Sequence, residues 1–196
     1  MQSTMTNAAF VSRLLLVRHG ATEPNLAGLR CGGDLDVPLT DLGREQAASA
    51  ATRILGLDVP VGVIVASDLL RTRETAAIIS RALGGVAIRI EPAFAERRLG
   101  AWNRMPVAET EAALAAGVTP PGGESDAAFV ERVAEATAAV LLPLQGRSPL
   151  LVGSKGVARV LRQLLGLPRG EGLMNGELLS LDLASMAQFE PFGCHA

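Results

Sequence analysis

The sequence predicts an α/β fold built around a largely parallel sheet, and two observations lead to this prediction. Apolar runs of strand length alternate along the chain with longer segments of helical periodicity, which is the pattern of βαβ units. The 196 residues are 48% hydrophobic and 19% charged, which excludes a disordered chain and is enough for one well-buried domain. We expect a single domain at 13–185, with a flexible extension at 1–12 and a tail at 186–196.

The first half of the chain contains signals for two helices and a long loop between strands. Thr40 is a plausible N-cap for a helix over 41–55, and Ser67-Asp68 begins a second helix that continues to Ala82. The polar, glycine-rich stretch at 21–38 is too long for a simple turn, so it is a candidate functional loop. Three continuous apolar runs are the expected strands of this half: 14–17, 61–66 and 86–90.

The second half begins with an irregular loop at 92–106, which contains the only tryptophan, Trp102. Two alanine-rich helices follow on either side of a proline- and glycine-rich break. Next, a strand leads directly into a helix that Gly166 and Pro168 terminate, and a last strand completes the sheet. The expected helices are 107–116, 125–142 and 154–165, and the expected strands are 150–153 and 178–183.

Composition excludes several classes of partner. A net charge of −2, from 18 basic and 20 acidic residues, creates no field that would attract nucleic acid or an anionic membrane. Cys31 and Cys194 have neither the spacing of a zinc site nor that of a disulfide framework. No apolar run approaches the roughly 20 residues that span a bilayer. We therefore expect a cytoplasmic protein without nucleic-acid or membrane partners.

Candidate functional residues lie just after the expected strands, because open α/β sheets bind ligands beyond the carboxyl ends of their strands. After the first strand, Arg18 offers a planar fork of donors for phosphate, His19 offers an imidazole nitrogen, and Gly20 permits close approach to the backbone. By itself this triplet is equally compatible with a surface histidine in a turn. The other candidates of this kind are Ser67-Asp68, Glu96 and Ser154-Lys155-Gly156.

Five segments in order strengthen the functional interpretation: LLLVRHGATEPN, RCGGDLDVPLTDLGREQA, VASDLLRTRETA, ERRLGAWN and PPGGES. Together they resemble the histidine phosphatase superfamily, the phosphoglycerate-mutase-like proteins. The resemblance covers residues 14–183 and implies a three-layer α/β/α sandwich with a mostly parallel central sheet. It also implies a phosphatase that hydrolyses a small phosphomonoester through a phosphohistidine intermediate, without a metal or other cofactor. A mutase proper is less expected, since such enzymes are generally longer.

The resemblance assigns a role to several residues. His19 matches the nucleophile, and Arg18 and Arg71 match the two arginines that grip the phosphate. Glu96 matches the acid that protonates the leaving oxygen and later deprotonates the attacking water. The alternatives to these catalytic roles are surface salt bridges for the arginines and an ordinary loop glutamate for Glu96.

Two further positions match the substrate pocket of the family. Arg30 aligns with an arginine of the loop that lines this pocket, although the usual glutamine two positions on is here Gly32. Asn25 matches another pocket position, and Thr22 matches a third less clearly. We therefore expect Asn25 and Arg30 to contact the substrate.

The last motif of the family departs from its usual pattern in this chain. Ser154 stands where the second active-site histidine of the family is expected, and no shift of alignment restores it, since the only other histidine is His195. The resemblance implies that this histidine donates to the phosphoryl oxygens, and we expect Ser154 to bind the phosphate with only a neutral hydroxyl. A hydrogen bond to a charged group contributes about 1.5 to 3 kcal/mol, so the replacement is expected to lower the rate about 10- to 100-fold. Two compensations are open, the single lysine Lys155 and His195. The alternative function is a weak or inactive family member that binds a phosphorylated ligand or partner.

Overall fold

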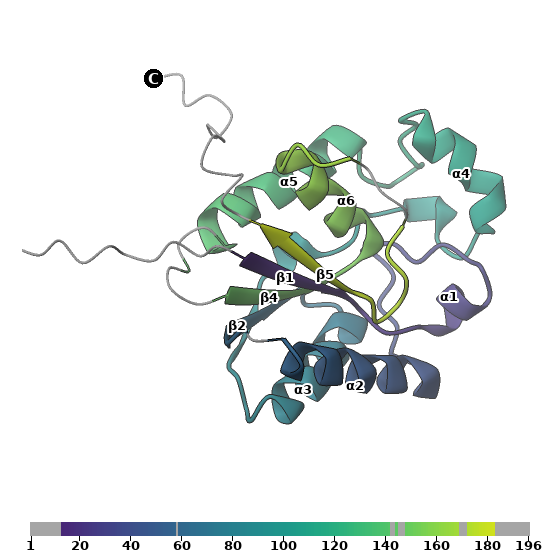
Figure 1. The fold of residues 1–196 in the computed structure, drawn as a ribbon. Helices are drawn as coiled ribbons and strands as arrows, with labels where there is room; N and C mark the ends of the chain where they lie inside the picture. The colour runs from purple at the N-terminus through teal and green to yellow at the C-terminus, as the bar shows by residue number, and fades with distance from the viewer. Residues whose placement is uncertain (1–12, 58, 142–143, 145–147, 169–171, 183–196) are drawn as a thin grey trace, which may run out of the picture.

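A computed structural model describes residues 13–57, 59–141, 144, 148–168 and 172–182. Within them the chain forms three layers, a five-stranded sheet between two layers of helices (Figure 1). The strand order is β3-β2-β4-β1-β5, with β5 antiparallel to β1 and the other neighbours parallel. The predicted α/β sandwich with a mostly parallel sheet is confirmed. The expected extension at 1–12 and the tail at 186–196 lie outside the described residues. The strands are β1 (Arg13–Arg18), β2 (Val61–Ala66), β3 (Ile88–Ile90), β4 (Ser148–Gly153) and β5 (Leu178–Asp182).

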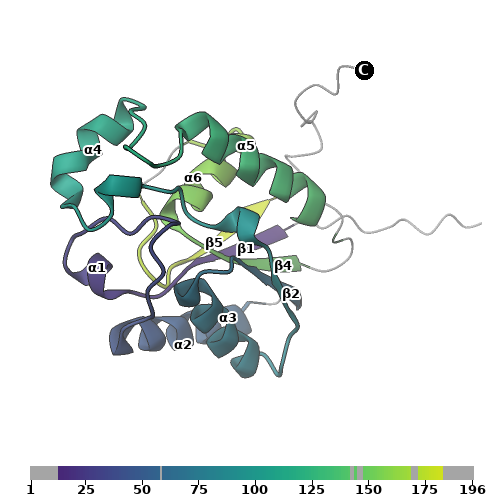
Figure 2. The same ribbon diagram turned by 180° about the vertical axis from the view of Figure 1, so that it is seen from behind.

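Helices cover both faces of the sheet, so the central strands contain continuous apolar runs rather than alternating apolar and polar residues. In β1, Leu14 and Leu16 pack under α5 (Asp126–Ala136) and α6 (Lys155–Leu164). Leu15 and Val17 face the opposite layer, formed by α2 (Asp41–Leu55) and α3 (Leu70–Ala82). Figure 2 shows the same two layers from behind.

Two further helices and the loop after β3 lie at the carboxyl ends of the parallel strands (Figure 1). The short helix α1 (Glu23–Leu26) and the helix α4 (Val107–Ala115) stand at this edge of the sheet. The loop after β3 contains two 3-10 turns, η1 (Pro92–Phe94) and η2 (Gly100–Trp102). The expected functional loop and the irregular loop therefore meet at one end of the domain. In the described part of the chain, every helix is too short or too polar to cross a membrane.

The expected elements occur in the predicted order, but several boundaries differ. Helix α3 begins at Leu70 rather than at Ser67, because the hydroxyl of Thr72 bonds the carbonyls of Ser67 and Leu69 and closes a turn there. Strand β3 begins at Ile88, where its pairing with β2 starts. The helix expected at 125–142 changes after α5 to a π-helical turn, η3 (Thr137–Leu141).

The first turn of α2 lies directly against the segment that follows β1. The hydroxyl of Thr40 accepts a hydrogen bond from the N–H of Gly43 at 3.1 Å, which confirms the predicted N-cap. A Cβ added to Gly20 would lie 2.1 Å from the carbonyl oxygen of Gly43, and one added to Gly43 would lie 2.2 Å from that of Ala21. Because only glycine fits this approach, the sequence at both positions fixes the backbone next to His19.

Candidate active site

His19 follows β1 and is held between the ends of two neighbouring strands. Its N–H donates to the carbonyl of Gly153 at the end of β4 at 2.9 Å, and its side chain is 4% exposed. The ring nitrogen Nδ1 lies 2.8 Å from the carbonyl oxygen of Gly20, which can only accept, so Nδ1 carries the hydrogen and donates it. The other nitrogen, Nε2, therefore keeps its lone pair, as a nucleophile requires.

The surroundings of His19 keep its imidazole neutral. Burial lowers its pKa well below the ordinary value of 6.5, and the positive charges of Arg71 and Arg18 lower it further. The hydrogen bond to the carbonyl of Gly20 opposes these effects only in part. At neutral pH the lone pair on Nε2 is thus available.

Arg71 and Arg18 are the two cations whose charges act on His19. Arg71 is fully buried on α3 and donates to the carbonyls of Leu35 at 2.8 Å and Gly32 at 3.0 Å. Arg18 donates to the carbonyl of Leu173 at 2.6 Å. The Nε atoms of both arginines are buried without a hydrogen-bond partner among the described residues. Unpaired buried donors are costly, and an oxyanion beside His19 would satisfy them.

Burial also acts on the pKa of Arg18. It lowers this pKa, and the charge of Arg71 adds to the effect, while the carboxylate of Glu96 opposes it. Two desolvated guanidinium groups in one site repel each other, and a doubly charged anion would relieve that repulsion.

Glu96 reaches the site from the loop after β3, and its carboxylate is held by two backbone donors. Oε1 accepts from the N–H of Arg97 at 2.7 Å, and Oε2 accepts from the N–H of Gly156 at 2.9 Å. Gly156 lies in the first turn of α6, so the carboxylate sits against the positive end of that helix. A Cβ at position 156 would lie 2.0 Å from Oε1, which makes glycine necessary for this contact.

Ser154 is the N-cap of α6 and is only 3% exposed. Its hydroxyl accepts a hydrogen bond from the N–H of Val157 at 3.4 Å, so the side chain caps the helix. Lys155 is exposed, and its stem contacts Gly172, where an added Cβ would lie 2.4 Å from Cε. The other expected compensating residue, His195, lies outside the described residues.

Asn25 and Arg30 lie in the expected functional loop, and both have partners within the protein. Oδ1 of Asn25 accepts from the backbone N–H of Thr22 at 3.2 Å. Arg30 donates through Nε to the hydroxyl of Thr110 at 2.7 Å and forms an ion pair with Glu111 at 2.6 Å. Arg30 thus ties the loop to α4 while it also lines the cavity described below.

Sequence reasoning missed a second support for His19, the turn that precedes β5. The side-chain amide of Asn175 donates to the carbonyl of His19 at 2.9 Å and to Oδ1 of Asn25 at 3.2 Å. The N–H of Gly176 donates to the carbonyl of Arg18 at 3.0 Å. The Asn-Gly pair at 175–176 is a turn signal that could have marked this segment, but its distance from His19 in sequence hid the contact.

A second missed feature fixes the loop that carries Glu96. Arg132 on α5 donates to the carbonyls of Ala93 at 2.7 Å and Ala95 at 3.1 Å. It also forms a bidentate pair with the buried carboxylate of Glu124, at 3.0 and 2.8 Å. This pair anchors the segment leading to Glu96 on α5.

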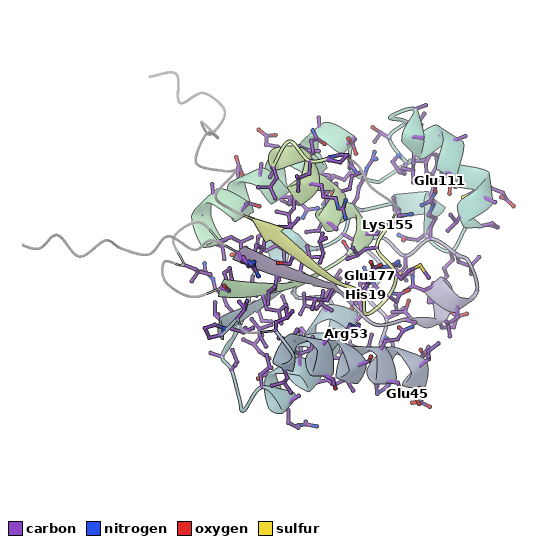
Figure 3. All side chains as sticks on the ribbon, in the orientation of Figure 1. His19, Glu45, Arg53, Glu111, Lys155 and Glu177 are labelled. Carbon is purple, nitrogen blue, oxygen red and sulfur yellow. The ribbon has the colours of Figure 1, made fainter. Side chains whose placement is uncertain are left out.

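A cavity of about 680 Å³ opens at this end of the sheet. Residues of seven separate segments line it, with Arg18, Arg30, Glu96 and Lys155 among them. In Figure 3, Glu111 lies on α4 and Lys155 at the start of α6, the two helices that flank it. Among the described residues no group of three or more His, Cys, Asp or Glu side chains could hold a metal ion. The cationic side chains of the lining, among them Arg18, Arg30 and Lys155, fit an anionic ligand.

Comparison with known proteins gives a consistent picture. A family model of the histidine phosphatase superfamily (branch 1) matches residues 14–193. Glucosyl-3-phosphoglycerate phosphatase of Mycolicibacterium vanbaalenii is 40% identical over 131 residues, which are 62% of this chain and 56% of that protein. The match thus spans little more than half the length of that relative. Probable phosphoglycerate mutase GpmB of Escherichia fergusonii is 37% identical over 173 residues, which are 80% of this chain and 76% of that protein.

A solved structure is also similar. The mycobacterial glucosyl-3-phosphoglycerate phosphatase in complex with VO3 has a TM-score of 0.74 and 32% identity. This similarity covers 87% of this chain and 92% of that one.

Proposed function

The chain belongs to branch 1 of the histidine phosphatase superfamily, and from this premise we propose that it is a phosphatase that hydrolyses a small phosphomonoester through a phosphohistidine at His19. One observation carries the proposal. The neutral imidazole, with its lone pair on Nε2, lies beside the buried Arg71 and the half-buried Arg18, whose Nε atoms are both buried and unpaired within the described residues.

The chemistry needs the site residues in two steps. In the first, Glu96 is in its protonated carboxylic acid form: Nε2 of His19 attacks phosphorus, and the P–O bond of the ester breaks as Glu96 gives its proton to the leaving oxygen and becomes a carboxylate. Arg18 and Arg71 neutralise the phosphoryl oxygens during this transfer. In the second, Glu96 takes a proton from water, the resulting hydroxide attacks phosphorus, and the P–N bond breaks to release phosphate and free His19.

We further propose that Ser154 lowers the rate of this chemistry compared with a histidine at the same position. A serine hydroxyl is a neutral donor: its oxygen here accepts the N-cap hydrogen bond of α6, and its O–H can offer a phosphoryl oxygen only an uncharged hydrogen bond. A charged hydrogen bond at the transition state contributes about 1.5 to 3 kcal/mol, which corresponds to about 10- to 100-fold in rate.

The test uses the purified full chain with p-nitrophenyl phosphate, with and without EDTA. We expect turnover that EDTA leaves unchanged and that His19→Ala abolishes. Lack of turnover on a broad panel of phosphomonoesters would overturn the proposal.

The neutral hydroxyl of Ser154, at the position where a charged donor is expected, favours one second candidate, a family member that binds a phosphorylated ligand or partner and does not turn it over. Ser154→His separates the two functions. If the wild type binds phosphate without turnover and Ser154→His raises activity by orders of magnitude, the binding function is supported. If the wild type turns over well and His19→Ala removes that activity, it is excluded.

A further inference from the structure

The cavity beside His19 carries more positive than negative charge. Six cationic and three acidic side chains line it. Glu111 pairs with Arg30 at 2.6 Å, and Asp126 lies 2.6 Å from Arg159 and 3.4 Å from Arg97. The third carboxylate, that of Glu96, accepts hydrogen bonds from two backbone N–H groups. The acidic side chains of the cavity are therefore all engaged.

Three of the six cations have no carboxylate partner among the described residues: Arg18, Lys155 and Arg162. Arg18 belongs to the phosphate site. Lys155 and Arg162 stand seven positions apart on α6, which places them on one face of the helix, about 10 Å apart along its axis. They form a positive stripe that begins next to the phosphate site and continues away from it.

Part of the cavity lining is apolar. Leu114 and Ala115, at the end of α4, line the same cavity, as does Leu173 from the segment before β5. Such a lining suits a carbon skeleton, while Lys155 and Arg162, which have no carboxylate partner in the part of the chain that the structure describes, can meet a second charged group.

We infer that Lys155 and Arg162 form a second anion-binding subsite, and that the substrate is a phosphomonoester whose carbon skeleton also carries a carboxylate or a second phosphate. The inference rests on the proposed function for the phosphate end of the cavity. The additional observation is the pair of cations on α6, Lys155 and Arg162, which a substrate with a single anionic group would not contact.

The experiment compares two matched pairs of sugar phosphates. 6-Phosphogluconate differs from glucose 6-phosphate by a carboxylate at the far end, and fructose 1,6-bisphosphate differs from fructose 6-phosphate by a second phosphate. We expect kcat/KM to be about tenfold higher for the doubly anionic member of at least one pair, as for one charge-assisted contact. The pair that shows the preference identifies the second group as carboxylate or phosphate.

Arg162→Ala is expected to remove this preference by lowering kcat/KM for the doubly anionic member alone. Arg81→Ala, which alters an exposed arginine of α3 outside the cavity, is the matched control and should preserve it. Lys155→Gln is expected to reduce the same preference. An equal loss for both members of a pair would instead remove Lys155 from the subsite and assign it to the phosphoryl group.

Equal kcat/KM within both pairs, or an equal loss for both members in Arg162→Ala, would overturn the subsite. If none of the four compounds is turned over, calorimetric binding of the same compounds decides the question. A binding preference that Arg162→Ala removes would then support the subsite, while the broad panel of phosphomonoesters decides separately whether the protein is a phosphatase. Equal binding within both pairs would overturn the subsite independently of activity.

Discussion

Substitution of Gly156 by alanine should separate activity from stability. The added Cβ would lie 2.0 Å from Oε1 of Glu96 and 2.8 Å from its Cδ, whereas ordinary contact begins near 3.4 Å. The carboxylate must therefore move by more than about 1 Å, and a shift of this size at a reacting group costs about 100-fold in rate. We expect kcat/KM to fall by about this factor in Gly156→Ala.

The stability of the same variant should change little, because two effects oppose each other. Alanine in a helix is favoured over glycine by about 0.5 to 1 kcal/mol. The hydrogen bond from the N–H of Gly156 to Glu96 is weakened or lost, which costs about 0.5 to 1.5 kcal/mol. We expect the free energy of unfolding to stay within about 1 kcal/mol of the wild type.

The assay measures kcat/KM for an aryl and an alkyl phosphate, together with urea unfolding. The loss should be larger for the alkyl phosphate, since its poor leaving group needs the proton from Glu96. Gly56→Ala is the control, because Gly56 ends α2 with negative φ and an added Cβ would meet only ordinary contacts. A Gly156→Ala variant with wild-type kcat/KM, or an equal loss on both substrates, would refute the proposed role of Glu96.

Three further predictions follow from the buried polar groups. Because burial lowers the pKa of His19 in the folded state, the unfolded state takes up a proton at His19 below about pH 6.5 while the folded state does not. Between pH 7.5 and 5.5, the free energy of unfolding of the wild type should therefore fall by about 1.4 kcal/mol more than that of His19→Asn. The same pH dependence of urea unfolding in both proteins would contradict this. Arg71→Lys loses the planar fork that donates to two loop carbonyls, so the free energy of unfolding should fall by about 1 to 3 kcal/mol and KM for p-nitrophenyl phosphate should rise; wild-type values of both would argue against this role. Arg132→Met leaves the carboxylate of Glu124 buried without its cation and should lower the free energy of unfolding by about 3 to 5 kcal/mol. Adding Glu124→Gln to the same chain should partly restore this stability. Chemical denaturation of both variants measures the effect, and a loss below about 1 kcal/mol for Arg132→Met would count against the stabilising role of the Arg132–Glu124 pair.

Local signals predicted the order of the elements well. The apolar run at β1 and the Thr40 cap of α2 are properties of short stretches of chain, so they could be recognised without the fold. The start of α3 could not be located in this way. The N–H of Leu70, at its first turn, donates to Oδ1 of Asp36 at 2.7 Å, an acceptor from a loop 34 residues earlier.

The predicted site residues show the same division. The motifs marked His19 and Glu96, and the principle that ligands bind at the carboxyl ends of strands placed both at one edge of the sheet. The supports of these residues are long-range contacts without a local signature. Asn175 bonds the carbonyl of His19 across 156 positions of sequence, and Arg132 holds the carbonyl of Ala93 from 39 positions away. Only the folded chain brings these groups together.

The central claim is that His19 carries the phosphoryl group during turnover. The direct measurement is rapid quenching of the wild-type chain with a phosphomonoester at neutral or alkaline pH, followed by peptide mass spectrometry. We predict a phosphoryl group on His19 that acid removes, as expected for a P–N bond, and that is absent in His19→Ala. Hydrolysis of the substrate without any phosphorylated His19, or undiminished turnover by His19→Ala, would contradict the account.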